Sequence, residues 1–131
     1  MCKRRVLVVD DDINLSRLAA IILESSGKYE VMMVQESVRA IAAAVRFQPD
    51  VMLLDVDMPG LSGGDIAREA ACDSRLRDVP ILFLTGLVRP EETRNGPVES
   101  GGRQFLSKPV DPAQLLASIG KLLSSIFTPG T

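Results

Sequence analysis

The sequence contains no histidine and no tryptophan, and it has only two cysteines. Without histidine the chain cannot carry a Ser-His catalytic pair, an imidazole-based zinc site or a phosphohistidine of its own. Cys2 and Cys72 are too few for a disulfide framework, and no metal-ligand spacing surrounds them. No apolar run approaches the ~20 residues that span a bilayer, and the amino terminus lacks a signal-peptide core. We therefore expect a cytoplasmic protein without a membrane partner.

An excess of positive charge is also missing. The chain has 15 basic and 17 acidic residues, a formal net charge of -2, so we expect no direct binding to nucleic acid. The hydrophobic fraction of 46% and the charged fraction of 24% are ordinary for a globular protein. Because 131 residues can bury one hydrophobic core without disulfide bonds or structural metal ions, we expect a single domain over residues 1–131, with its core at about 4–126.

The chain does contain five short apolar runs that alternate with helical patterns. Such runs, closed by charged or turn residues, predict buried strands, here over residues 6–9, 29–34, 51–54, 79–84 and 103–107. The clearest helical pattern follows Asp111-Pro112, and the least regular stretch is 90–97, where Asn95-Gly96-Pro97 should break a helix within two turns. The fourth helix is thus expected to be short or in two pieces.

Residues that favour helix starts precede three of these helical patterns. Asp12 or Asn14 can cap the first helix, Ser37 the second, and Asp111 the last.

Strands that alternate with helices predict an α/β fold, since parallel strands need right-handed crossover connections. We expect a single doubly wound (βα)5 three-layer sandwich, with a parallel five-stranded sheet covered on both faces. The flavodoxin-like strand order 2-1-3-4-5 suits five units and places the first and third strands side by side. Asp10 and Asp11 would then lie next to Asp55.

Asp55 closes the third predicted strand and opens the turn-rich stretch DVDMPGLSGG. Taken alone, Asp55 could be a polar residue that merely starts a turn. Three carboxylates at one sheet edge repel each other unless a cation joins them, and oxygen clusters of this kind suit Mg²⁺ or Mn²⁺. Asp10, Asp11 and Asp55 therefore predict a site for a divalent ion.

A hydroxyl and an amine stand at the ends of the next two predicted strands, on Thr85 and Lys108. Together with a divalent ion they supply what a phosphoryl group needs, which leaves Asp55 available as the nucleophile. Each also has a plainer interpretation. Thr85 could be a strand-end residue with high β propensity, and Lys108 a solvated surface lysine.

Four motifs, VLVVDDD, LLDVDMPGLSG, FLTG and FLSKPV, follow one another at consecutive predicted strand ends. In this order they resemble the receiver domain of two-component response regulators, over roughly residues 4–126. The resemblance implies a phosphorylation-operated switch in signal transduction and not a turnover enzyme. Asp55 would accept a phosphoryl group from the phosphohistidine of an external histidine kinase or phosphotransfer protein, with Mg²⁺, and a partner-binding surface would change.

The resemblance also implies a role for each matching position. Asp10 and Asp11 match the acidic pair that binds the metal, and Asp57 matches the position whose backbone carbonyl coordinates it. The remaining matches are the switch hydroxyl Thr85, the switch aromatic Phe105 and the phosphoryl-contacting amine Lys108, whose bond to Pro109 is expected to be cis. Asp12 is interpreted as a helix cap and not a third ligand. Phe105 can equally be an ordinary core residue.

Asp57 departs from the pattern of many relatives, which have a neutral side chain there, so we expect altered metal affinity or acyl-phosphate lifetime. Two other functions stay open. One is a pseudo-receiver, a protein-interaction module without phosphoryl transfer. The other is a phosphatase of the haloacid dehalogenase type, suggested by Asp55-x-Asp57. The sequence leaves open the cognate kinase, the output partner, the oligomeric state, and whether the chain is a stand-alone receiver or part of a larger regulator or hybrid kinase.

Overall fold

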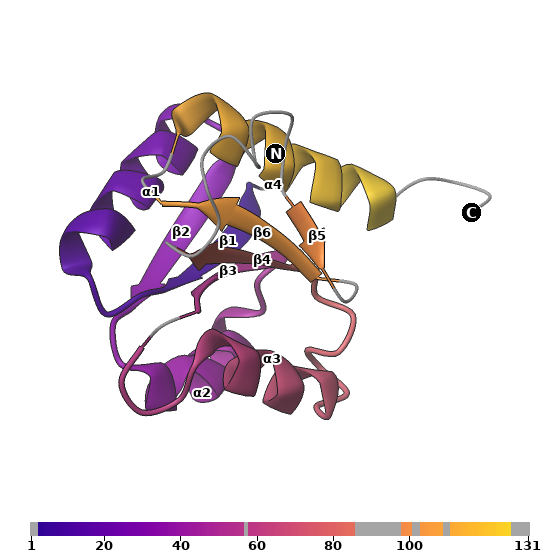
Figure 1. The fold of residues 1–131 in the computed structure, drawn as a ribbon. Helices are drawn as coiled ribbons and strands as arrows, with labels where there is room; N and C mark the ends of the chain where they lie inside the picture. The colour runs from indigo at the N-terminus through magenta and orange to yellow at the C-terminus, as the bar shows by residue number, and fades with distance from the viewer. Residues whose placement is uncertain (1–2, 57, 86–97, 101–102, 109–110, 127–131) are drawn as a thin grey trace.

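The computed structural model describes residues 3–56, 58–85, 98–100, 103–108 and 111–126. One sheet with the strand order β2-β1-β3-β4-β6-β5 has α1 and α4 on one face and α2 and α3 on the other (Figure 1). The strands are β1 (Arg4–Val9), β2 (Tyr29–Val34), β3 (Val51–Asp55), β4 (Ile81–Thr85), β5 (Val98–Ser100) and β6 (Arg103–Ser107). The helices are α1 (Ile13–Ser25), the 3-10 turn η1 (Ser37–Arg39), α2 (Ala40–Phe47), α3 (Gly63–Ala71) and α4 (Pro112–Ile126).

The predicted α/β fold and strand order are confirmed. The strands β2, β1, β3, β4 and β6 are all parallel and correspond to the five predicted strands in the order 2-1-3-4-5. A sixth strand that the sequence did not predict, β5, pairs antiparallel with β6 at the sheet edge. The short fourth helix expected within 90–97 lies outside the described residues.

The apolar strands are explained by burial on both faces of the sheet. Alternate residues of one strand enter different cores: Val6 and Val8 pack with residues of α1 and α4, whereas Leu7 and Val9 pack with residues of α2 and α3. A parallel strand covered by helices on both faces has no solvent side, so its sequence is continuously apolar. The polar residues that end these runs therefore mark the place where the chain leaves the core.

Two of the three predicted helix caps are confirmed. The Asp12 carboxylate accepts hydrogen bonds from the backbone N–H groups of Asn14 and Leu15, at 3.0 and 3.2 Å. The Asp111 carboxylate accepts one from Gln114 N–H at 3.0 Å. Both satisfy N–H groups that a helix start leaves without partners.

The predicted Ser37 cap is wrong. Ser37 is the first residue of η1, the residue before it makes no side-chain capping bond, and the Ser37 hydroxyl bonds instead to the loop after β3. The predicted start of the fourth strand at residue 79 is also two residues early. The Val79 N–H donates to Leu76 O at 3.0 Å in the preceding turn, and Pro80 has no N–H to donate.

Candidate functional site

The carboxyl ends of four neighbouring parallel strands bring the predicted site residues together. Asp10 follows β1, Asp55 and Thr85 end β3 and β4, and Lys108 follows β6. Backbone hydrogen bonds extend the sheet into this edge: Asp10 N–H donates to Val34 O at 3.1 Å, and Lys108 N–H donates to Thr85 O at 2.9 Å. The sheet therefore fixes the backbone from which each of these side chains projects.

Three carboxylates meet at this edge. Asp10, Asp11 and Asp55 each offer an oxygen, and these oxygens lie within 4.8 Å of one another. Asp10 and Asp55 are almost fully buried, with 1% and 2% of their surface exposed, whereas Asp11 is exposed. The cluster thus has two carboxylates in the protein interior and one that opens toward solvent.

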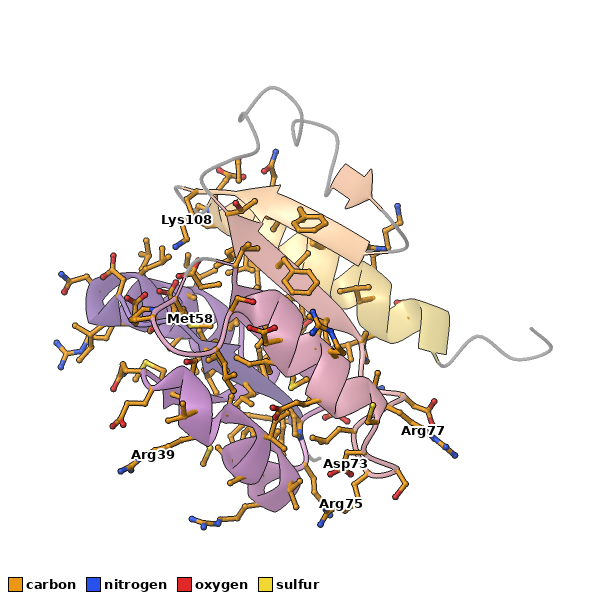
Figure 2. The ribbon with its side chains drawn as sticks, turned by 60° about the horizontal axis from the view of Figure 1, so that its bottom comes forward. Arg39, Met58, Asp73, Arg75, Arg77 and Lys108 are labelled. Atoms are coloured by element: carbon orange, nitrogen blue, oxygen red, sulfur yellow. The ribbon has the colours of Figure 1, made fainter. Side chains whose placement is uncertain are left out.

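Lys108 is the cation that faces the buried pair. Its Nζ lies 2.9 Å from Asp55 Oδ1 and 3.6 Å from Asp10 Oδ2. In the view of Figure 2, Lys108 lies on the same side of the molecule as Met58, in the loop after β3, and away from Asp73 and Arg75 beyond α3. One ammonium therefore neutralises part of the charge of two carboxylates.

This charge arrangement shifts two pKa values. Burial raises the pKa of Asp10 to about 6, although the hydrogen bond from Asp12 N–H opposes the rise, and the nearby Asp55 charge adds to it. Burial would lower the pKa of Lys108, but the hydrogen bond to Asp55 and the charges of Asp10 and Asp55 outweigh it and raise that pKa. The cluster therefore holds Lys108 as a cation and disfavours the ionised form of Asp10.

The donor set fits a hard divalent ion. Asp10 Oδ2 is buried and, among the described residues, has no hydrogen-bond partner. A buried carboxylate oxygen without such a partner is costly unless a charge lies nearby, and Lys108 at 3.6 Å provides only part of that charge. Mg²⁺ prefers one or two carboxylates together with water, which the exposed side chain of Asp11 allows. Asp10, Asp11 and Asp55 could therefore hold Mg²⁺ or Mn²⁺.

Of the other predicted site residues, the structure describes Thr85 and Phe105 but not Asp57. Thr85 is buried at the end of β4, with 2% of its surface exposed. Phe105 is half-buried on β6 and stacks on Phe83 of β4, with ring centroids 5.1 Å apart. Asp57 and the bond from Lys108 to Pro109 lie outside the described residues. The roles of Thr85, Phe105 and Asp57 stay predictions.

Two residues that hold this edge were missed as site residues. A Cβ built on Gly63 would lie 2.5 Å from the backbone oxygen of Asp55, so only glycine fits where α3 meets β3. Its signal in the sequence was the Gly-Gly pair after Ser62. Ser37 bonds to the loop after β3 from 22 and 24 residues away, and no local pattern could have indicated that contact.

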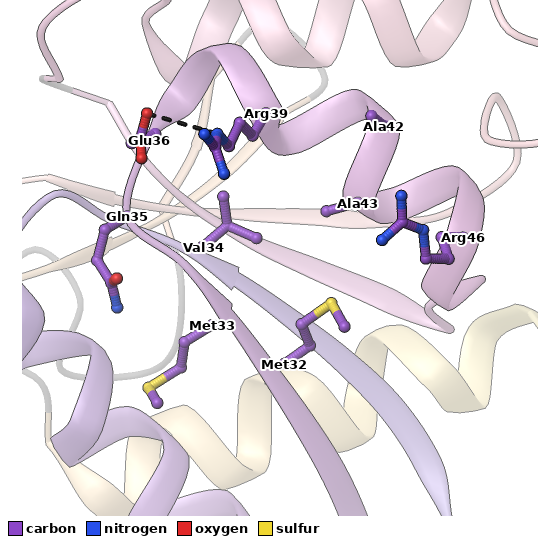
Figure 3. Close-up of a pocket in the computed structure, with 9 residues that line it drawn as sticks. All are labelled: Met32, Met33, Val34, Gln35, Glu36, Arg39, Ala42, Ala43 and Arg46. Carbon is purple, nitrogen blue, oxygen red and sulfur yellow. Dashed lines mark ion pairs between the residues drawn. The ribbon is translucent and has the colours of Figure 1, made fainter.

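A groove of about 410 Å³ lies along the open edge of the sheet, between β2 and α2. Figure 3 shows Met32 and Met33 on the strand side and Arg39 and Arg46 on the helix side, with Arg39 paired to Glu36 at 3.5 Å. None of the clustered carboxylates is among the residues described as lining this groove. The groove is therefore distinct from the candidate ion site.

Comparison with known families identifies the family of this chain. The family model for the response regulator receiver domain matches residues 6–120, which include the carboxylates and Lys108. The chain belongs to this family. Receiver domains are signalling domains of two-component systems, so the predicted resemblance is confirmed, and it favours the receiver over the phosphatase interpretation.

Curated relatives of this receiver domain include longer regulators. The DNA-binding dual master transcriptional regulator RpaA of Synechocystis sp. is 35% identical over 119 residues, which cover 91% of this chain and 48% of RpaA. The DNA-binding response regulator MtrA of Mycobacterium tuberculosis is 33% identical over 117 residues, which cover 89% of this chain and 49% of MtrA. The chain thus spans about half the length of these relatives.

Solved receiver structures agree with the fold. The chemotaxis protein CheY4 of Vibrio cholerae has a TM-score of 0.78 at 30% identity, covering 92% of this chain and 99% of CheY4. The receiver domain of sensor histidine kinase PA1611 of Pseudomonas aeruginosa has a TM-score of 0.78 at 25% identity, covering 94% of this chain and 99% of that one. That structure has a magnesium ion in its active-site cleft.

Among the residues described for this receiver domain, no helix has the length and apolarity needed to cross a bilayer.

Proposed function

We propose that this receiver domain is a phosphorylation-operated switch that accepts a phosphoryl group on Asp55. The observation that carries the proposal is the 2.9 Å contact of Lys108 Nζ with Asp55 Oδ1, in a cluster to which Asp10 and Asp11 contribute two further carboxylates. A nucleophilic carboxylate, a fixed cation and a set of oxygen ligands are the groups that phosphoryl transfer requires.

In the proposed reaction an Asp55 carboxylate oxygen forms a bond to phosphorus while the bond from phosphorus to the donor's imidazole nitrogen breaks. The electron pair of the broken bond stays on that nitrogen. The donor is the phosphohistidine of an external histidine kinase or phosphotransfer protein, because this chain contains no histidine. Lys108 holds Asp55 in place beforehand and faces the phosphoryl oxygens afterwards, where its charge offsets theirs.

Asp10 and Asp11 would hold the divalent ion together with Asp55, and we assign the backbone carbonyl of Asp57 to the same ion. When bound, Mg²⁺ would supply positive charge against the phosphoryl oxygens. Asp10 must be ionised to serve as a ligand, so its raised pKa makes the proton a competitor of the ion.

The output of the switch is proposed to pass through Thr85 and Phe105. The new charge on Asp55 would attract the Thr85 hydroxyl, and Phe105, which lies on the adjacent strand β6, would move with it. We further propose that residues 1–131 act as one domain, in the cytoplasm, on a partner protein or effector domain and not by direct contact of this chain with DNA. The DNA binding named for RpaA and MtrA belongs to those longer proteins.

Intact-mass measurement after incubation with acetyl phosphate and Mg²⁺ tests the proposal. We expect the mass of one phosphoryl group to be added to the unchanged protein, and neither to Asp55→Ala nor to the unchanged protein in EDTA. A protein that gains no mass although it is folded would instead be a pseudo-receiver, and one that releases phosphate from a small phosphomonoester would be a phosphatase. Either result would refute the switch.

A further inference from the structure

The hydroxyl of Ser37, the first residue of η1, bonds to the loop that follows the proposed phosphoacceptor Asp55. Ser37 Oγ donates a hydrogen bond to Pro59 O at 2.9 Å and accepts one from Leu61 N–H at 2.9 Å. The serine is 4% exposed, so water does not readily replace these bonds. One buried hydroxyl therefore serves as donor and acceptor to a loop more than 20 residues away in the sequence.

The backbone conformation of the loop after β3 allows both hydrogen bonds to Ser37. Gly60, between the two bonded residues, has a φ of +86°, a left-handed conformation that favours glycine. A Cβ built there would lie 3.0 Å from Ser37 Oγ, which leaves no room for a side chain without movement of the serine. The backbone turns at Gly60 in such a way that the Pro59 carbonyl and the Leu61 N–H reach the same oxygen.

The same loop connects Asp55 to α3 and is fixed at both ends. Near Asp55, Val56 N–H donates to Leu84 O at 3.0 Å. At the other end, Ser62 and Asp65 form a reciprocal capping box at the start of α3. Ser37 bonds to the middle of the loop from η1, the 3-10 turn that leads into α2. The helix α2 lies on the same face of the sheet as α3.

We propose that Ser37 is a positioning residue for phosphoryl transfer at Asp55. Its hydroxyl holds the loop after β3 against η1, so that the backbone next to Asp55 is already in place when the divalent ion binds. Hydrogen bonds made directly to metal ligands commonly change metal affinity by roughly 10-fold to 100-fold, because they fix the ligands' orientation before binding. Ser37 bonds to the loop after Asp55 and not to a ligand, so we expect an effect at the lower end of that range. This inference rests on the proposed function, since it concerns the ion and the phosphoryl acceptor of that same site.

Ser26 offers a matched control. Its hydroxyl also donates to a carbonyl, Leu23 O at 2.7 Å, and accepts from an N–H, Lys28 N at 3.2 Å. It lies after α1, where Lys28 O accepts from Arg4 N–H at the beginning of β1, the opposite end of the strand from Asp10. Ser26→Ala therefore removes the same two kinds of bond without touching the site.

The test is titration with Mn²⁺ alone, followed by the electron paramagnetic resonance signal of the free ion, at a temperature where each variant is folded. We expect Ser37→Ala to bind Mn²⁺ roughly 10-fold more weakly, and Ser26→Ala to bind it as tightly as the unchanged protein. Ser37→Thr keeps the hydroxyl and should restore the affinity. If Ser37→Ala cannot be obtained folded, Gly60→Ala gives the same test, because its Cβ would displace Ser37 Oγ, and it should also bind Mn²⁺ more weakly.

Unchanged Mn²⁺ affinity in Ser37→Ala would overturn the inference, and so would equal losses in Ser37→Ala and Ser26→Ala. A Ser37→Thr variant as weak as Ser37→Ala would also overturn it, because packing and not the hydroxyl would then be responsible. In each of these cases the unchanged protein still binds Mn²⁺ and gains a phosphoryl group, so the proposed function survives. If the unchanged protein binds no Mn²⁺ and gains no mass from acetyl phosphate, both fail.

Discussion

At the scale of single residues, the site has more negative than positive charge. Lys108 is the cation that contacts its two buried carboxylates, Asp10 and Asp55. Asp10 and Asp55 are both nearly inaccessible to water, and Asp11 adds a third carboxylate at the opening. A single ammonium 2.9 and 3.6 Å from the buried pair cannot offset all three charges. This excess of negative charge raises the affinity of Asp10 for a proton, and a divalent ion would have to compete with that proton.

The first prediction concerns the effect of pH on stability in EDTA. The folded-state pKa of Asp10, about 6, lies above the ordinary value of 3.8, so between these two values the folded protein binds a proton that the unfolded chain releases. Stability is therefore favoured at the acidic end of this window and falls as the pH rises through it. Asp10→Asn removes this loss. We expect it to gain on the order of 2 kcal/mol relative to the unchanged protein between about pH 4 and pH 8.

Urea unfolding of both proteins at the two pH values measures this difference. With saturating Mg²⁺ the advantage of Asp10→Asn at high pH should disappear or reverse, because the ion stabilises only the protein that keeps its ligand. An identical pH dependence of the two proteins in EDTA would show that Asp10 ionises without cost, and the charge imbalance would then be no feature of this site.

The second prediction separates ion binding from phosphoryl transfer. Lys108→Ala removes a positive charge that competes with the ion for Asp10 and Asp55, so Mn²⁺ affinity should rise, on the order of 10-fold. The same change removes the cation that faces the phosphoryl oxygens, so the rate of phosphorylation by acetyl phosphate should fall roughly 100-fold. Mn²⁺ titration and time-resolved intact mass would show these opposite effects. A fall in both quantities would mean that Lys108 chiefly maintains the fold.

At the scale of elements, the junction of β3 with α3 is the most constrained part of the site. The first residue of α3, Gly63, lies so close to Asp55 that a Cβ would come within 2.5 Å of the Asp55 backbone oxygen. The Gly63 N–H also donates to Val56 O at 3.3 Å. The start of the helix is therefore packed directly on the backbone of the proposed phosphoacceptor.

The third prediction uses two glycines in helices. Gly63→Ala must push α3 away from β3, and overpacking of this kind costs about 1–3 kcal/mol. Gly120→Ala is the control within α4. Its nearest neighbour would be Tyr29 Oη at 4.0 Å, so the higher helix propensity of alanine should stabilise the protein by about 1 kcal/mol. Thermal unfolding of the two variants should give shifts of opposite sign. A stabilised Gly63→Ala protein would contradict the close packing at Asp55.

The fourth prediction tests whether Asp12 is a cap or a ligand. Its carboxylate accepts hydrogen bonds from two N–H groups at the start of α1, and its own N–H donates to Asp10 Oδ1 at 2.9 Å. Asp12→Ala removes the two capping hydrogen bonds and leaves the backbone hydrogen bond to Asp10, so we expect a loss of about 1 kcal/mol in stability and unchanged Mn²⁺ affinity. Weaker Mn²⁺ binding without loss of stability would make Asp12 a ligand.

At the scale of the whole molecule, the sequence predicted the fold because burial on both faces of the sheet leaves a simple signature. The apolar run at residues 6–9 of β1 stops at Asp10, and the run at residues 51–54 of β3 stops at Asp55, so the position and the carboxyl end of each strand could be read from the sequence. Parallel pairing then requires these ends to meet at one edge. The clustering of the carboxylates with Lys108 followed from topology alone.

What could not be predicted depends on contacts between distant segments. The strand β5 has three residues and no distinctive pattern, and only its antiparallel pairing with β6 defines it. Ser37 had the composition of a helix cap, but its partners Pro59 and Leu61 lie 22 and 24 residues further along the chain. The stacking of Phe105 on Phe83 likewise requires two strands to be placed before it can be seen.

Of the three clustered carboxylates, we propose that Asp55 alone accepts the phosphoryl group. Tandem mass spectrometry of the protein after treatment with acetyl phosphate and Mg²⁺ tests it most directly, because it assigns the added mass to a residue. We expect modification of Asp55 alone, which is lost in Asp55→Asn and retained, at a lower rate, in Lys108→Ala. Modification of Asp10 or Asp11 in place of Asp55, or an Asp55→Asn protein modified to the same extent, would contradict it.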